Sequence, residues 1–127
     1  MLKTVAKIFG IVLILTGILG FVPAFAPNNH LLGVFHIDTL HNFIHLGSGL
    51  AALTCGFLSV RAARLYFQIF GVIYALVAAL GLAYMDNDIL GVLANNMADV
   101  LLHVVIAGSA LAFGFGSFGQ KTDAATP

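Results

Sequence analysis

Four long hydrophobic stretches, separated by short polar segments, make up almost the whole chain. They cover about residues 4–26, 39–60, 65–84 and 98–118. A helix needs about 20 apolar residues to cross the hydrocarbon core of a bilayer, and each stretch reaches this length. Because backbone amides in lipid must find partners within the protein, these stretches should be helical. The pattern predicts an all-α fold, a transmembrane four-helix bundle.

The composition supports a lipid-embedded protein and excludes several classes of function. Hydrophobic residues make up 61% of the chain and charged residues 8%, and the mean hydropathy is +1.06. The formal net charge is zero, so no basic surface is available for nucleic acid. The lone Cys55 excludes an internal disulfide and a zinc site of paired cysteines. No serine or cysteine has the sequence context of a catalytic nucleophile, so we expect a binding or structural protein rather than an enzyme.

The charged residues predict an orientation in the membrane. All basic residues fall on one side, with a pair in the tight turn between the second and third stretches: Lys3, Lys7, Arg61, Arg64 and Lys121. By the positive-inside rule this side is the cytoplasm. The connecting segments 27–38 and 85–97 contain no Lys or Arg and should face outward. We expect one membrane domain over residues 1–119, both termini in the cytoplasm, and a flexible tail over residues 120–127.

The chain also resembles itself, which predicts an internal duplication. The segment KIFGIVLILTGILG from Lys7 aligns with QIFGVIYALVAALG from Gln68, and LLGVFHIDTLHNFIHL from Leu31 aligns with ILGVLANNMADVLLHV from Ile89. Both copies start on the same side of the membrane. We therefore expect two parallel two-helix hairpin repeats, related by a pseudo-twofold axis along the membrane normal.

The duplication places four ligand-type side chains at equal depth. His41 aligns with Asp99 and His45 with His103, and each helix carries its pair at i,i+4 on one face. At a rise of ~1.5 Å per residue, His45 and His103 should lie about 10 Å inside their helix starts. Ionisable groups at such depth usually face a partner or a wet cavity, and three imidazoles with one carboxylate suit zinc, copper or non-haem iron. The sequence predicts a transition-metal site formed by His41, His45, Asp99 and His103.

Other polar residues near this predicted site have expected supporting roles. Metal-bound imidazoles usually hydrogen-bond to a further polar group, and the local candidates are Asp38, Asn42, Asn95 and Asn96. His36 shortly precedes the second helix and could be an additional ligand. Asp99 also has a structural explanation, because Asn96 and Asp99 have the spacing of a capping box at a helix start.

Two other functions are compatible with the same residues. His45 and His103 could coordinate a haem b or a related pigment from both sides, as in b-type cytochromes, for electron transfer or sensing. Alternatively, the polar residues could only hold the helices together by hydrogen bonds, in a small accessory subunit of a homo-oligomer or a larger membrane complex.

The segments that carry these residues resemble a known family. LLGVFHIDTLHNFIHLGSGLAAL, GVIYALVAALG and NNMADVLLHVVIAGSALAFG resemble the bacterial integral-membrane family called domain of unknown function 4383. The resemblance extends from about Lys7 to Phe118. The family's HNxxH and NxADxxLH elements correspond by position to His41, Asn42, His45, Asn95 or Asn96, Asp99 and His103. The resemblance implies a multi-pass, four-span protein of the bacterial inner membrane and implies no particular activity.

Overall fold

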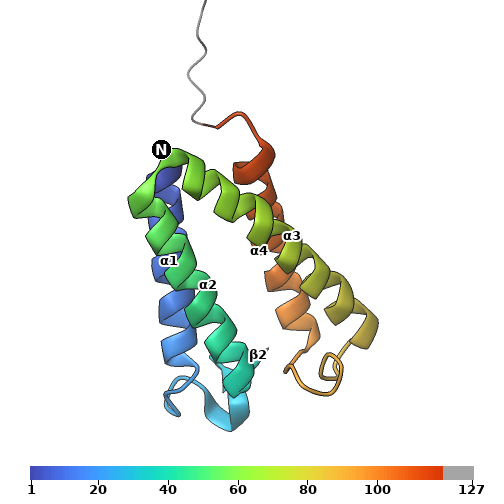
Figure 1. Cartoon of the computed structure of the whole chain (residues 1–127). Coiled ribbons are helices and arrows are strands. Elements are labelled where there is room, and N and C mark those ends of the chain that lie inside the picture. Colours follow the sequence, from blue (N-terminus) through green and yellow to red (C-terminus); the bar gives the residue numbers. More distant parts are fainter. Residues whose placement is uncertain (119–127) are drawn as a thin grey trace, which may run out of the picture.

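The chain is helical, as the hydrophobic pattern predicts. The computed structural model describes residues 1–118, and this range contains four α-helices: α1 (Leu2–Leu19), α2 (Thr39–Leu58), α3 (Val60–Tyr84) and α4 (Met97–Phe115). The helices run alternately up and down, with α1 packed along α2 and α3 packed along α4 (Figure 1). The all-α prediction is confirmed. The predicted tail, residues 120–127 with Lys121, lies outside the described residues.

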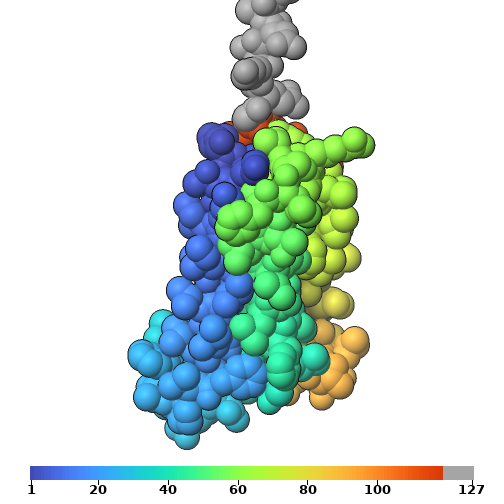
Figure 2. Space-filling view, turned by 60° about the vertical axis from the view of Figure 1, so that its left-hand side comes forward, coloured from blue at the N-terminus to red at the C-terminus, as the bar shows by residue number. Residues whose placement is uncertain are grey.

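The surface of the bundle is apolar and the polar side chains lie inside. On α2, for example, Leu40, Phe43, Leu50 and Phe57 are exposed. In Figure 2, α1 (blue) and α2 (green) form a continuous column, with the connection between them at one end. The buried polar side chains of residues 1–118 are His41, Asn42, His45, Ser48, Asn95, Asp99 and His103. This distribution is expected for helices surrounded by lipid.

Three of the helices in residues 1–118 are long and apolar enough to cross a membrane: α1, α3 and α4. The remaining helix, α2, is long enough at 20 residues. Its lower hydropathy comes from His41, Asn42 and His45, which lie close together near its start and are all buried.

Two helix boundaries differ by five residues or more from those that the hydrophobic pattern predicts, and the others agree to within three. α1 ends at Leu19 and not near Ala26, because Pro23 interrupts the hydrogen-bonding pattern of a helix. α3 begins at Val60, directly after Ser59, whose Oγ accepts the N–H of Ala62 at 3.0 Å. The predicted turn containing Arg61 and Arg64 is therefore wrong, since both arginines belong to the first turns of α3.

Arg64 connects the start of α3 to the end of α4. Its guanidinium donates to the carbonyl oxygens of Gly116 and Phe118, each at 2.7 Å, and to that of Gly114 at 3.3 Å. The last carbonyls of a helix have no partner within the helix. Arg64 therefore supplies hydrogen bonds that close this end of the bundle.

Glycines allow a close approach within each helix pair. A Cβ atom on Gly10 of α1 would lie 2.6 Å from the carbonyl oxygen of Gly49 and 2.7 Å from the nitrogen of Leu53, both on α2. A Cβ atom on Gly71 of α3 would lie 3.0 Å from the nitrogen of Leu111 on α4. Small residues commonly permit such backbone contact between membrane helices. Both pairs are therefore packed backbone against backbone.

The connections α1–α2 and α3–α4 contain the same tight turn. In the first connection, the 3-10 helix η1 (Pro27–Asn29) precedes the antiparallel strands β1 (His30–Leu31) and β2 (Phe35–His36). Leu32 and Gly33 form the turn with positive φ angles of 54° and 73°, and Leu90 and Gly91 repeat it at 53° and 70°. Paired positive φ angles are typical of the tight turns that reverse a chain.

The residues that cap α2 and α4 tie these connections together. Asp38, the N-cap of α2, accepts the N–H of His41 at 2.7 Å through Oδ1 and the N–H of Ala94 at 2.8 Å through Oδ2. Asn96, the N-cap of α4, donates from Nδ2 to the carbonyl oxygen of Val34 at 2.8 Å. Each cap thus also bonds to the opposite connection, which fixes the starts of the two helices relative to each other.

Candidate metal centre

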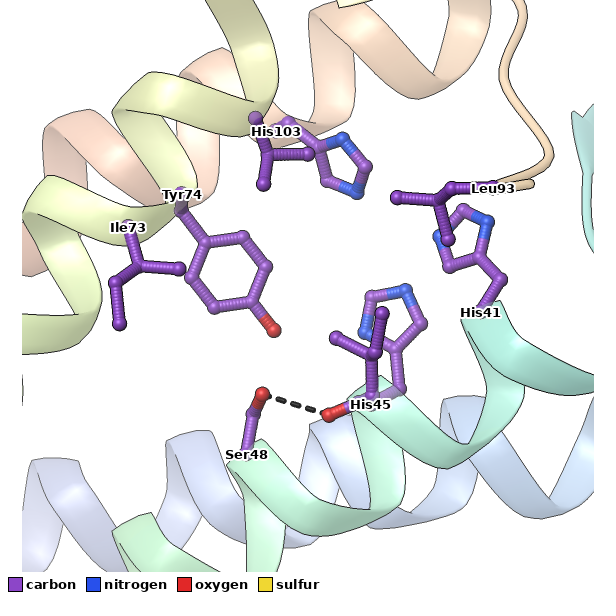
Figure 3. A pocket seen from close by; sticks show the side chains of 9 residues that line it. His41, His45, Ser48, Ile73, Tyr74, Leu93 and His103 are labelled. Carbon is purple, nitrogen blue, oxygen red and sulfur yellow. Dashed lines mark hydrogen bonds between the residues drawn. The ribbon is translucent and has the colours of Figure 1, made fainter. Parts of the chain in front are cut away.

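The two capped helices carry three histidines into the interior of the bundle. His41 and His45 are one turn apart on α2, so they lie on the same face of this helix. His103 lies on α4, in its second turn. Figure 3 shows the three imidazoles turned toward one another across the space between the helices. The predicted convergence of His41, His45 and His103 is therefore observed; we call these residues the histidine cluster.

The spacing within the histidine cluster is close to that of a metal site. One ligand nitrogen from each residue can be chosen so that all three lie within 4.8 Å of one another. The ring centroids are 4.8 Å apart for His41 and His45, 5.6 Å for His41 and His103, and 6.1 Å for His45 and His103. Three nitrogens bound to one ion at ~2.0–2.1 Å would stand about 3.5 Å apart. The chosen nitrogens are therefore up to about 1 Å farther apart than the ligands of one ion, and binding requires the side chains to rotate closer together.

The imidazoles are buried, and each has an unpaired nitrogen. The exposed fractions are 2% for His41 and 3% for both His45 and His103. Within residues 1–118, no group hydrogen-bonds to the Nδ1 atom of any of the three. An unsatisfied buried polar atom costs about 1–3 kcal/mol, and native structures retain few of them. Three such atoms within one cluster of imidazoles therefore require an explanation, and an ion shared by the imidazoles would provide one.

A small cavity of about 40 Å³ lies beside the histidine cluster. Its walls combine polar and apolar side chains from α2, α3, α4 and the α3–α4 connection: His41, His45, Ser48, Tyr74 and His103, with Ile44, Ile73, Val77 and Leu93. A site needs roughly 10–15 Å³ of such volume to hold one water. The cavity therefore has room for an ion together with one small ligand.

Tyr74 belongs to this site, although nothing in the surrounding segment GVIYALVAALG indicates a ligand-binding residue. Its ring centroid lies 6.5 Å from that of His45 and 5.8 Å from that of His103, and the side chain is 3% exposed. Its hydroxyl points into the cavity, on the same side as Ser48 (Figure 3). In the aligned segments KIFGIVL and QIFGVIY, Tyr74 stands where the first copy has Leu13. That difference between the copies is the one sequence signal that could have identified it.

Asp99 is buried at the start of α4 but is not part of the histidine cluster. Its Oδ2 accepts the N–H of Asn96 at 2.9 Å, and its own N–H donates to Oδ1 of Asn96 at 2.9 Å. This reciprocal pair is a capping box. The capping box that the spacing of Asn96 and Asp99 suggested is therefore observed.

Asn95 closes the C-terminal end of α3. Its Nδ2 donates to the carbonyl oxygens of Met85 at 2.7 Å, Gly81 at 3.1 Å and Asn87 at 3.3 Å. The side chain is fully buried. It therefore bonds the end of α3 to the connection that follows, in addition to the hydrogen bond from the Met85 N–H to the carbonyl oxygen of Gly81 at 2.8 Å.

The other residues predicted to support the imidazoles also lie at helix ends. Asp38 and Asn96 are the N-caps described above. Asn42 is buried against the end of α1, where a Cβ atom on Gly20 would collide with the Asn42 amide. These contacts position the helices that carry the histidines.

His36 lies in the α1–α2 connection, outside the histidine cluster. Its Nδ1 is 3.5 Å from Oδ1 of Asp88 in the other connection. Its ring stacks on His30 with the centroids 4.9 Å apart, consistent with the pairing of these residues across β1 and β2. His36 therefore joins the two connections on their outer side.

The fold and the site together define a class of α-helical membrane protein in which apolar helices enclose a cluster of histidines. The chain belongs to the family described as Domain of unknown function (DUF4383), whose model matches residues 3–116. The resemblance seen in the sequence is confirmed. No curated protein and no solved structure matches the chain. Because the family description assigns no activity, the function has to be argued from the geometry of the site.

Proposed function

We propose that this protein binds one transition-metal ion at the histidine cluster. The convergence of the three imidazoles supports the proposal, because their ligand nitrogens lie within 4.8 Å of one another in a buried place. Three neutral imidazoles are ligands that zinc, copper and iron accept. Magnesium and calcium prefer oxygen ligands, so they are poor candidates for this cluster.

Asp99 enters this proposal as a positioning residue. The sequence predicted it as the fourth ligand, but its Oδ2 already accepts a backbone N–H in the capping box of α4. The box fixes the first turn of the helix that carries His103. We therefore assign metal binding to the three histidines and assign the orientation of α4 to Asp99.

The proposal includes four crossings of a bacterial inner membrane and an origin by duplication. The apolar exposed side chains of α2 support its membrane placement. The equal turns at Leu32–Gly33 and Leu90–Gly91 support the duplication. So do the matched glycine contacts, since Gly10 faces Leu53 and Gly71 faces Leu111, and these residues align between the copies.

The alternative functions have less support from the site. A haem held by His45 and His103 needs far more room than about 40 Å³, since larger organic ligands occupy pockets of roughly 300–1,000 Å³. Histidines that served only as hydrogen-bonding links between helices would use their polar atoms, whereas within residues 1–118 all three Nδ1 atoms lack a partner. Both observations favour a metal ion held directly by the three histidines, without a porphyrin.

Metal analysis of the purified full chain tests the proposal. Protein extracted from membranes into mild detergent without added metal, and then protein titrated with Zn²⁺ and Cu²⁺, should bind about one ion per chain. His45→Gln and His103→Gln should each weaken binding by roughly 100-fold or more, because each removes a ligand. Elemental analysis and competition with a chromophoric chelator measure both quantities.

The exposed connection offers matched controls. His30→Gln and His36→Gln remove imidazoles that lie outside the histidine cluster, so they should leave the stoichiometry and the affinity within a few-fold of the original. Thermal unfolding in detergent should show that all four variants fold. Binding that is absent from the original chain, or that survives replacement of the cluster histidines, would contradict the proposal.

A further inference from the structure

The histidine cluster supplies three ligands, which leaves a coordination position to be filled. Among residues 1–118, the group of ligand-type side chains that can share an ion contains only His41, His45 and His103. Structural zinc sites usually have four protein ligands, whereas sites that bind exogenous molecules have three and keep one position open. The donor set therefore resembles that of an open site.

The space beside the cluster contains a hydrogen-bond donor without an acceptor. The Tyr74 hydroxyl is buried, points into the cavity (Figure 3) and has no hydrogen-bond partner within the described residues. Ser48, its nearest polar neighbour in that view, donates its own proton to the carbonyl oxygen of Ile44 at 2.6 Å. A phenol held in this way is suited to donate to a ligand that occupies the cavity.

The remaining cavity wall limits what this ligand can be. Ile44 and Ile73 line the cavity and are also 39% and 44% exposed on the outer surface of α2 and α3. The cavity wall formed by these two side chains is therefore apolar. The volume of about 40 Å³ restricts the occupant to a molecule of a few heavy atoms.

We propose that the ion bound by the histidine cluster carries a small exogenous ligand in its open position, and that the Tyr74 hydroxyl donates a hydrogen bond to it. The ligand class is a small anion such as hydroxide, derived from water, or a molecule of similar size. Tyr74 keeps its proton and selects for an occupant that can accept a hydrogen bond. This inference rests on the proposed metal binding and adds what the bound metal can take.

Azide is a suitable probe of the open position, because it is small, accepts hydrogen bonds and has a neutral conjugate acid that can pass an apolar wall. The detergent-solubilised full chain is loaded with Cu²⁺, and separately with Co²⁺, and titrated with azide. The expected result is a saturable change in the visible absorption of the metal. Benzoate, which exceeds the cavity volume, should produce no such change.

Tyr74→Phe and Tyr66→Phe form a matched pair for the role of Tyr74. Both tyrosines lie on α3, are 3% exposed and carry a hydroxyl without a partner in the described residues, but Tyr66 lies about two turns nearer the start of the helix, in the apolar core. Tyr74→Phe should keep metal affinity within a few-fold and weaken azide binding by roughly 10- to 100-fold, as expected for a lost hydrogen bond to a charged group. Tyr66→Phe should change neither quantity.

The possible failures are distinguishable. A chain that binds no metal overturns the proposed function and this inference with it. A metal-loaded chain that gives no spectral response to azide shows that the proposed open coordination position is not available. Metal binding by the histidine cluster would be unaffected by that result. Equal azide affinity in the original chain and in Tyr74→Phe shows that Tyr74 has no part in holding the ligand.

Discussion

At the scale of single residues, Asp99 stabilises the start of α4 and is not a member of the histidine cluster. It lies one turn before His103, and its carboxylate is used by the capping box. We expect Asp99→Asn to retain metal affinity within a few-fold, because the amide oxygen can still accept the N–H of Asn96. Asp99→Ala should lower the free energy of unfolding by about 1 kcal/mol through loss of the cap. Metal titration and thermal unfolding in detergent measure these effects.

His45→Gln is the reference for interpreting the two Asp99 variants. A loss of affinity in Asp99→Asn as large as that in His45→Gln, at unchanged stability, would show that Asp99 is a ligand after all. The unfolding measurement is necessary because a loosened α4 would also move His103 and weaken binding indirectly.

The sequence identified the histidines but not Tyr74, for a physical reason. The i,i+4 spacing of His41 and His45 follows from the helical period, and the aligned position of His103 follows from the similarity of the two halves. The approach of Tyr74 to His103 depends on how α3 packs against its neighbours, and no spacing rule encodes that. The role of Asp99 was ambiguous for a different reason, since a helix cap and a metal ligand can both be an aspartate.

At the scale of helices, the close contact between α1 and α2 depends on Gly10, which packs against the backbone of α2. We expect Gly10→Ala to lower the free energy of unfolding by about 1–3 kcal/mol, because the new Cβ would lie 2.6 Å from the carbonyl oxygen of Gly49 and the helices would have to separate. The midpoint of thermal unfolding in detergent should fall accordingly. Metal affinity should fall as well, since α2 carries His41 and His45.

Gly47→Ala is the matched control for the glycine contact. Gly47 is also in α2, but a Cβ atom there would meet nothing within 4 Å. The substitution should leave stability unchanged or raise it by up to about 1 kcal/mol, because alanine favours helix more than glycine does. Equal destabilisation by Gly10→Ala and Gly47→Ala would mean that backbone contact between α1 and α2 is not what the glycine provides.

The helices themselves were predictable, while two of their ends were not. Length and hydropathy predicted the helices, because a membrane leaves few other conformations to apolar stretches. The end of α1 at Leu19 and the start of α3 at Val60 depend on local breaks and caps that a hydrophobic average does not detect. Pro23 and Ser59 were the available signals, a helix breaker and an N-cap residue.

At the scale of the whole molecule, the basic residues and the histidine cluster lie toward opposite ends of the bundle. Lys3 and Lys7 near the start of α1, and Arg61 and Arg64 near the start of α3, lie at the end that also holds the end of α4 (Figure 1). His41 lies near the start of α2, beside the connections at the opposite end. If the basic end is cytoplasmic, the ion and its ligand reach the histidine cluster from outside the cell.

Cysteine labelling tests this orientation with two matched valines. In a Cys55→Ala background, Val34→Cys places a thiol in the α1–α2 connection, and Val60→Cys places one at the start of α3; the two side chains are 51% and 46% exposed. By the positive-inside rule, a membrane-impermeant maleimide should label Val34→Cys in intact spheroplasts and Val60→Cys only after lysis. The histidine cluster lies nearer the end of the bundle that contains Val34. The reverse labelling pattern would therefore place the site on the cytoplasmic side of the membrane. The metal would then have to come from the intracellular pool, although binding by the histidines would be unaffected.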